Sequence, residues 1–124
     1  MIVGIGTDAL EVARVRRDLR REDDVLRAAF TPREIEYCER MRHPARHYAA
    51  RFAAKEAFVK ALGTGFGAGI GWRDVEVRHD AAGAPALVLH GAARRMAARR
   101  RVTRVWVSLS HTASLATATV VIER

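Results

Sequence analysis

Two lysines stand out among the side chains of this sequence that could do chemistry. Lysine and arginine total 22 residues, yet Lys55 and Lys60 are the only lysines, and both lie in the stretch "RFAAKEAFVKALGTG" (51–65). Arginine is a planar cation that stays charged, whereas lysine is a compact ammonium whose pKa shifts on burial. A proton donor or a tight phosphate contact could demand lysine, but two neighbouring lysines also arise by chance. The count alone leaves both interpretations open.

Asp8, Glu56 and His111 are the other candidates for catalysis or metal binding. On a helix, Glu56 and Lys60 project together from the side opposite an apolar one. That apolar side consists of Ala54, Ala57, Phe58, Ala61 and Leu62. Taken singly, each candidate also has a structural interpretation. Asp8 would be a turn residue, and His111 a packed histidine. Glu56 would form an exposed i, i+4 salt bridge with Lys60, worth roughly a few tenths of a kcal/mol.

The elements that position these side chains begin with a short strand. Residues Ile2 to Gly6 form a brief apolar run, which favours a buried strand with Asp8 at its mouth. A helix follows, and its apolar side chains are Leu10, Val12, Val15 and Leu19. The remaining surface of that helix is a basic ridge, made of Arg14, Arg16, Arg17, Arg20 and Arg21. The N-terminal segment therefore predicts an acidic residue beside a basic helix.

Two further helices are predicted by their end signals. "FTPRE" is typical of a helix start, with Thr31 as N-cap, Pro32 at the first position and Glu34 completing a capping box. This helix should run to about Arg42. A third helix begins after Pro44 and carries both lysines. It should stop at a run of glycines that no helix tolerates: Gly63, Gly65, Gly67, Gly69 and Gly71.

The second half of the chain shows the two-residue period of strands. Alternating apolar residues at 75–77 and 87–89 flank the turn "AAGAP" and predict a hairpin, and 91–101 is a short arginine-rich helix. Alternation returns at 105–110 and 116–122, which predicts two closing strands. The sequence therefore favours an α+β fold, in which helices cover one face of a mainly antiparallel sheet.

Length and composition narrow the class of protein. At 124 residues the chain is predicted to form one domain, 1–124. The opening "MIVGIGTD" lacks the basic leader of a signal peptide, and no apolar run is long enough to span a membrane, so we expect a cytoplasmic protein. Cys38 has no second cysteine to pair with, which favours a structural role.

The net charge of +8 attracts anions, whether nucleic acid, anionic membranes, acidic proteins or phosphorylated small molecules. Only 6% of the residues are aromatic, and no basic cluster is interleaved with aromatic residues. A base-stacking surface for nucleic acid is therefore disfavoured. The alternative to an enzyme is a non-catalytic basic module that binds nucleic acid through its arginines.

Four motifs, taken together, resemble the holo-acyl-carrier-protein synthases, the short class of 4'-phosphopantetheinyl transferases. "GIGTD" with "LEVARV" is similar to the amino-terminal signature of that family, and "FAAKEAFVKALGTG" matches its central motif nearly residue for residue. "GWRDVEV", and "VSLSHT" followed by "ATATVVIE", resemble its last segments. The likeness covers almost the whole chain, and a basic nucleic-acid-binding module does not explain it.

The resemblance implies transfer of 4'-phosphopantetheine from coenzyme A to a serine of an apo carrier protein, with release of adenosine 3',5'-bisphosphate. Asp8 and Glu56 would hold Mg²⁺, an ion that takes oxygen ligands and completes its shell with substrate phosphate and water. Glu56, directly or through a metal-bound water, would take the serine proton. Lys60 would stabilise or protonate the departing bisphosphate. The role of Lys55 is open between packing and a subunit contact.

The same resemblance implies contacts with the coenzyme. The glycine run lacks the preceding strand and the spacing of a dinucleotide fingerprint; Gly63 and Gly65 would instead allow close approach of the backbone to the coenzyme. The other expected coenzyme contacts are Arg51, Ser110, His111 and Thr112. Two departures from the family pattern, Ala84 before the hairpin proline and Leu115 in place of an aromatic residue, concern only fine coenzyme contacts.

Partners are implied as well. Arg14, Arg17 and Arg21 on the basic ridge would contact an acidic carrier protein, and the family resemblance implies a homotrimer with active sites between subunits. Neither a membrane nor a nucleic acid is expected as a partner. The motifs do not indicate whether the carrier protein belongs to fatty-acid or polyketide synthesis.

Overall fold

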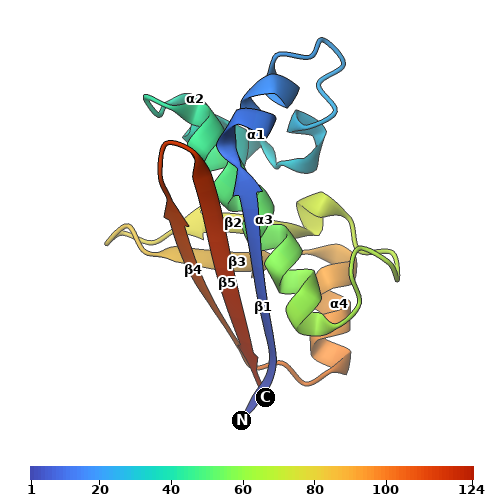
Figure 1. The fold of residues 1–124 in the computed structure, drawn as a ribbon. Helices are drawn as coiled ribbons and strands as arrows, with labels where there is room; N and C mark the ends of the chain where they lie inside the picture. The colour runs from blue at the N-terminus through green and yellow to red at the C-terminus, as the bar shows by residue number, and fades with distance from the viewer.

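Strands from both ends of the chain lie in one sheet. The computed structural model describes all residues from Met1 to Arg124 (Figure 1). Its strands are β1 (Ile2–Glu11), β2 (Val75–His79), β3 (Pro85–Leu89), β4 (Arg104–His111) and β5 (Leu115–Glu123). Its helices are α1 (Val12–Leu19), α2 (Pro32–Glu39), α3 (Pro44–Leu62) and α4 (Gly91–Arg99), with single 3-10 turns η1 (Arg27–Ala29) and η2 (Trp72–Asp74).

The larger sheet is antiparallel, has the order β1-β5-β4, and is covered on one face by α3 (Figure 1). Its register places Asp8 of β1 beside Ala118 of β5. β2 and β3 form a separate antiparallel hairpin. The face of the sheet that points away from α3 exposes large apolar side chains. Ile5 is 67% exposed, Trp106 51% and Leu115 41%. The predicted α+β fold, an antiparallel sheet with helices on one face, is confirmed.

Two glycines allow β1 to lie directly against the backbone of α3. A Cβ atom on Gly4 would lie 2.1 Å from the Ala61 carbonyl oxygen, and one on Gly6 would lie 1.9 Å from the Ala57 carbonyl oxygen. Any side chain there would push the strand away from the helix. Because side chains alternate along a strand, Asp8 shares the face of Gly4 and Gly6 and is brought to the surface of α3.

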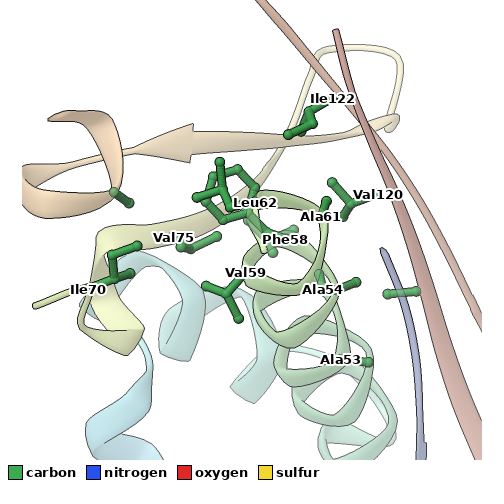
Figure 2. Close-up of a cluster of buried hydrophobic side chains, with 14 residues drawn as sticks. Ala53, Ala54, Phe58, Val59, Ala61, Leu62, Ile70, Val75, Val120 and Ile122 are labelled. Carbon is green, nitrogen blue, oxygen red and sulfur yellow. The ribbon is translucent and has the colours of Figure 1, made fainter. Parts of the chain in front are cut away.

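The helix α3 lies between two apolar layers. Figure 2 shows side chains of α3, such as Phe58, in one buried cluster with Val120 and Ile122 of β5 and with Ile70 and Val75. A helix that is apolar on most of its sides has to be buried in this way. A second cluster joins α1, α2 and the N-terminal half of α3; its larger members are Val12, Val15, Phe30, Cys38 and Tyr48. No helix of the protein combines the length and hydropathy needed to cross a membrane.

Several predicted boundaries were wrong. β1 continues to Glu11, so Asp8 lies inside a strand and not at its mouth. The reason is that β5 pairs with β1 as far as Glu11, a long-range contact that overrides the turn-like composition of the segment. α2 ends at Glu39 and α4 at Arg99, slightly earlier than expected. The hairpin and the two closing strands are confirmed.

Candidate active site

Asp8 and Lys60 connect β1 to α3. Lys60 Nζ donates hydrogen bonds to Asp8 Oδ1 and to the main-chain oxygen of Thr7, both at 3.1 Å. The structural alternative for Glu56, an i, i+4 salt bridge with Lys60, is not what the structure shows: Lys60 pairs with Asp8. The contact between the glycine face of β1 and α3 places the Asp8 carboxylate within reach of Lys60.

Asp8 and Glu56 line one pocket, with a volume of about 440 Å³. Arg14 of α1 and Phe52 of α3 form other parts of its wall. Burial raises the pKa of the Glu56 carboxyl, the negative charge of Asp8 raises it further, and Lys60 opposes both effects. The two carboxylates therefore repel each other in their ionised forms, and a bound cation would relieve that repulsion.

The carboxylate pair suits a hard divalent cation. Mg²⁺ binds oxygen ligands and commonly takes only one or two protein carboxylates, with water and substrate phosphate as the rest. No group of three or more His, Cys, Asp or Glu side chains in the protein is arranged to hold a metal ion. Asp8 and Glu56 thus fit Mg²⁺, and they do not resemble the closed nitrogen and sulfur sites that bind Zn²⁺.

Lys55 has a different environment from Lys60, because its side chain is fully buried. Its Nζ donates hydrogen bonds to Glu34 Oε1 at 2.8 Å, to the Trp72 main-chain oxygen at 3.1 Å and to the Val75 main-chain oxygen at 2.5 Å. Of the two roles left open for Lys55, packing is the one that the structure supports. Sequence reasoning missed Glu34 as its partner; the available signal was a lysine among alanines in "FAAKEAF".

Arg51 belongs to a second, basic pocket of about 440 Å³. Its guanidinium lies over the ring of Tyr37 at 4.0 Å and hydrogen-bonds His79 Nδ1 (3.1 Å) and the His47 main-chain oxygen (3.3 Å). Its Nε is buried without a partner. Three more arginines line this pocket: Arg33, Arg40 and Arg78. Burial, followed by the charge of Arg51, lowers the pKa of His79. Because the four arginines of the pocket outnumber its one carboxylate, Glu36, the pocket favours anions.

Ser110, His111 and Thr112 lie at the end of β4 and in the turn that follows, and all three are exposed. The His111 ring meets that of His47 edge-on, with centroids 5.0 Å apart. Burial, and then the proximity of His111, lower the pKa of His47 to about 4. The Thr112 hydroxyl accepts hydrogen bonds within the turn, from the backbone amides of residues 114 and 115. This end of the sheet therefore offers polar groups, but none of them lines the pocket of Asp8 and Glu56.

The predicted site residues separate into two sets within one chain. Gly63 ends α3 in the left-handed conformation (φ 79°), and Gly65 follows with φ 60°. The residues brought together around the carboxylate pocket are Asp8, Arg14, Glu56 and Lys60. The residues that do not line that pocket are Arg51, Gly63, Gly65, Ser110, His111 and Thr112.

The basic ridge is less regular than helical spacing predicted. Arg14 lines the carboxylate pocket and Arg17 is exposed on α1. Arg21 lies beyond the end of α1 at Leu19, and its guanidinium forms a 2.9 Å salt bridge with Asp23. The interpretation of Arg21 as part of the same helix is therefore wrong, although its side chain stays exposed on this surface.

Comparisons with known proteins agree with this geometry. Residues 4–120 match the family model of the 4'-phosphopantetheinyl transferase superfamily. A holo-[acyl-carrier-protein] synthase of Geobacter sp. (strain M21) is 48% identical over the full length of both chains, and one of Clavibacter sepedonicus is 50% identical over 99% of this chain and 97% of its own.

Solved structures are similar as well. The crystal structure of holo-[acyl-carrier-protein] synthase from Neisseria meningitidis superposes with a TM-score of 0.91, at 34% identity and full coverage of both chains. That of the Bacillus anthracis enzyme, described as a complex with CoA (3',5'-ADP), gives a TM-score of 0.81 at 35% identity, with 98% of this chain and 96% of that one covered. The chain therefore belongs to the 4'-phosphopantetheinyl transferase superfamily and, within it, to the holo-acyl-carrier-protein synthases, which are phosphopantetheinyl transferase enzymes.

Proposed function

We propose that this chain transfers the 4'-phosphopantetheinyl group of coenzyme A to a serine hydroxyl of an apo acyl carrier protein and releases adenosine 3',5'-bisphosphate. The observation that carries the proposal is the carboxylate pocket. There the charge of Asp8 acts on Glu56, and Lys60 donates a hydrogen bond to Asp8. The names of the relatives and the coenzyme described in the Bacillus anthracis crystal structure support the same reaction.

Asp8 and Glu56 would hold Mg²⁺ in this pocket. When bound, the ion neutralises the coenzyme diphosphate and orients it for in-line attack. Lys60 donates a hydrogen bond to Oδ1 of Asp8, and the other oxygen of that carboxylate would be available to the ion. Glu56 has to be ionised to bind the ion, so a cation would counteract the burial and repulsion that raise its pKa.

The reaction forms one bond and breaks one. The serine oxygen bonds to the phosphorus of the pantetheine arm, and the bond from that phosphorus to the bridging diphosphate oxygen breaks. The Glu56 carboxylate would accept the serine proton, directly or through a water molecule. The Lys60 ammonium is half exposed beside Asp8 and would donate a hydrogen bond or a proton to the departing bisphosphate.

The nucleotide end of the coenzyme needs a second set of residues. The basic pocket of Arg51, together with Ser110, His111 and Thr112, suits phosphate groups, and Gly63 and Gly65 allow close backbone approach. Because this set does not line the carboxylate pocket of the same chain, the complete site would combine surfaces of two subunits. A homotrimer would also cover the exposed apolar sheet face of Ile5, Trp106 and Leu115.

The carrier protein would bind at the entrance formed by α1. Arg14 reaches the carboxylate pocket, Arg17 is exposed beside it, and Arg21 lies on the following turn. A chain with a net charge of +8 attracts an acidic partner and would orient it before contact. An acidic carrier protein, a role in fatty-acid synthesis and a location in the cytoplasm stay predictions that follow from this function.

The proposal is tested by incubating the protein with coenzyme A, Mg²⁺ and an apo carrier protein and measuring the intact mass of the carrier. We expect the mass to increase by one phosphopantetheinyl group, and the increase to disappear when a chelator removes the metal. A panel of carriers from fatty-acid and polyketide synthesis identifies the acceptor. If no carrier gains mass while the protein binds nucleic acid in a salt-dependent manner, the basic-module alternative is correct.

A further inference from the structure

The environment of Lys55 indicates a role that differs from the role of Lys60. Its ammonium is fully buried, and its three hydrogen bonds go to Glu34, Trp72 and Val75, which lie 17 to 21 residues away in sequence. Three converging acceptors match the three donors of an ammonium group, whereas a planar guanidinium could not reach all three. The position therefore selects lysine for its geometry.

Glu34 connects this ammonium to two other elements. Its Oε1 also accepts a hydrogen bond from the backbone amide of Thr31 at 2.9 Å, which is half of the predicted and observed capping box of α2. Its Oε2 accepts from the backbone amide of Val77 in β2 at 3.0 Å. One buried ion pair thus joins the start of α2, the strand β2 and the middle of α3.

The main-chain acceptors of Lys55 lie where a glycine-rich loop ends. This loop, residues 63–71, connects α3 to η2; Trp72 directly follows it, and Val75 is the first residue after η2. At its start, the Arg100 side chain donates to the Leu62 carbonyl oxygen. Both ends of the loop are therefore held by cations that bind backbone carbonyl groups.

Two glycines within the loop are surrounded by open space. Nothing lies within 4 Å of the positions that Cβ atoms would take on Gly65 or Gly69. Phe66 stacks on Trp72 with ring centroids 3.8 Å apart, and Trp72 stacks in turn on Phe52 of the carboxylate pocket at 4.4 Å. Near the end of the loop, Ile70 is buried in the hydrophobic core. The end of the loop is thus held by Ile70 in the core and by Trp72, whose carbonyl group Lys55 binds.

We propose that Lys55 is a positioning residue: paired with Glu34, it fixes the end of the 63–71 loop against α3 so that the loop is already ordered when coenzyme A binds. This inference rests on the proposed function, because the loop carries Gly63 and Gly65 of the coenzyme surface. If the loop were ordered only a tenth of the time, the apparent affinity for the coenzyme would fall about tenfold.

The test uses Lys55→Met and Phe66→Ala in the full chain, with Val12→Ala as the control. Val12 is buried in the second core cluster and does not line the carboxylate pocket, so its loss lowers stability without touching the loop. Steady-state KM values for coenzyme A and for the carrier are measured well below the melting temperature of each variant. Hydrogen exchange of the amides at 64–71 is followed without coenzyme.

We expect Lys55→Met and Phe66→Ala to raise the KM for coenzyme A about tenfold and to leave the KM for the carrier within about twofold. Both variants should also speed hydrogen exchange at 64–71. The control should change neither. The proposal is overturned if Lys55→Met keeps the wild-type KM for coenzyme A and the wild-type exchange of the loop amides, or if Val12→Ala changes both quantities equally. If Lys55→Met does not fold, Glu34→Gln, which weakens the same buried ion pair, decides the outcome. Absence of transfer by the wild-type protein would instead refute the proposed function, and the exchange measurement would still test the role of Lys55.

Discussion

Gly6 of β1 lies so close to Ala57 of α3 that a Cβ atom at position 6 would be 1.9 Å from the Ala57 carbonyl oxygen. This contact sets the distance between strand and helix. The site residues Asp8, on the same face of β1, and Lys60, one turn further along α3, consequently meet at 3.1 Å. The glycines of "GIGTD" therefore position the carboxylate pocket although they carry no functional group.

Gly6→Ala should destabilise the protein by about 3 kcal/mol, because an added methyl group collides with backbone atoms that cannot move aside. Transfer activity should fall with it, since Asp8 would be displaced from α3. Urea unfolding and transfer rates measure the two effects. Gly67→Ala is the matched control: its Cβ would lie an ordinary 3.5 Å from the Thr64 carbonyl oxygen, so stability should change by less than about 0.5 kcal/mol. Equal stability of Gly6→Ala and the wild type would contradict this account.

Glu56→Gln should lower kcat at least about 100-fold through loss of the base and metal ligand. It should also raise the melting temperature at neutral pH. The folded-state pKa of Glu56 is raised above its ordinary value of 4.5, so ionisation of this group costs stability as the pH rises through the folded pKa. Below pH 4.5 the Glu56 carboxyl is protonated in both the folded and the unfolded protein. The stabilising effect of the substitution should therefore vanish at such low pH.

Thermal melts between pH 3.5 and 8 measure this effect of Glu56→Gln, and Mg²⁺ supplies a control for its cause. The ion should stabilise the wild type at neutral pH and have less effect on the variant, which lacks one carboxylate ligand. A variant that is less stable than the wild type at pH 7, or that keeps the full response to Mg²⁺, would show that Asp8 and Glu56 do not form a strained metal site.

Local signals predicted the parts of the fold that depend on neighbours in sequence. The capping box of Thr31 and Glu34 and the stop of α3 at Gly63 were correct because each lies within one turn of helix. The partners of the two lysines were not predictable in this way. Asp8 and Glu34 lie 52 and 21 residues from Lys60 and Lys55, and only the packing of β1 and α2 on α3 brings them together.

Lys60→Arg should lower kcat by roughly ten- to a thousandfold and leave the melting temperature nearly unchanged, because Lys60 is half exposed and its role is in the reaction. Lys55→Arg should instead leave kcat nearly unchanged and lower the stability. A guanidinium does not fit the buried site between Glu34 and Val75, so stability should fall by about 1–3 kcal/mol. Rates are compared at temperatures where both variants are folded. Near-wild-type kcat for Lys60→Arg would show that its positive charge is sufficient.

Arg17→Glu should raise the KM for the carrier protein and leave the KM for coenzyme A unchanged, because Arg17 is exposed on α1 and does not line the carboxylate pocket. The wild-type KM for the carrier should also increase with salt, since charges are screened over about 8 Å at physiological ionic strength. Arg101→Glu, exposed beyond α4, is a control for net charge. Equal losses with both variants would indicate a general charge effect instead of a carrier surface on α1.

The most direct measurement follows coenzyme A, the intact mass of the carrier protein and adenosine 3',5'-bisphosphate in one reaction with Mg²⁺. We expect one carrier adduct and one bisphosphate for every coenzyme A consumed, with the adduct on a serine. Asp8→Ala, checked for folding by its melting curve, should form almost none. Consumption of coenzyme A without a carrier adduct, or full transfer by Asp8→Ala, would contradict the proposed function of the carboxylate pocket.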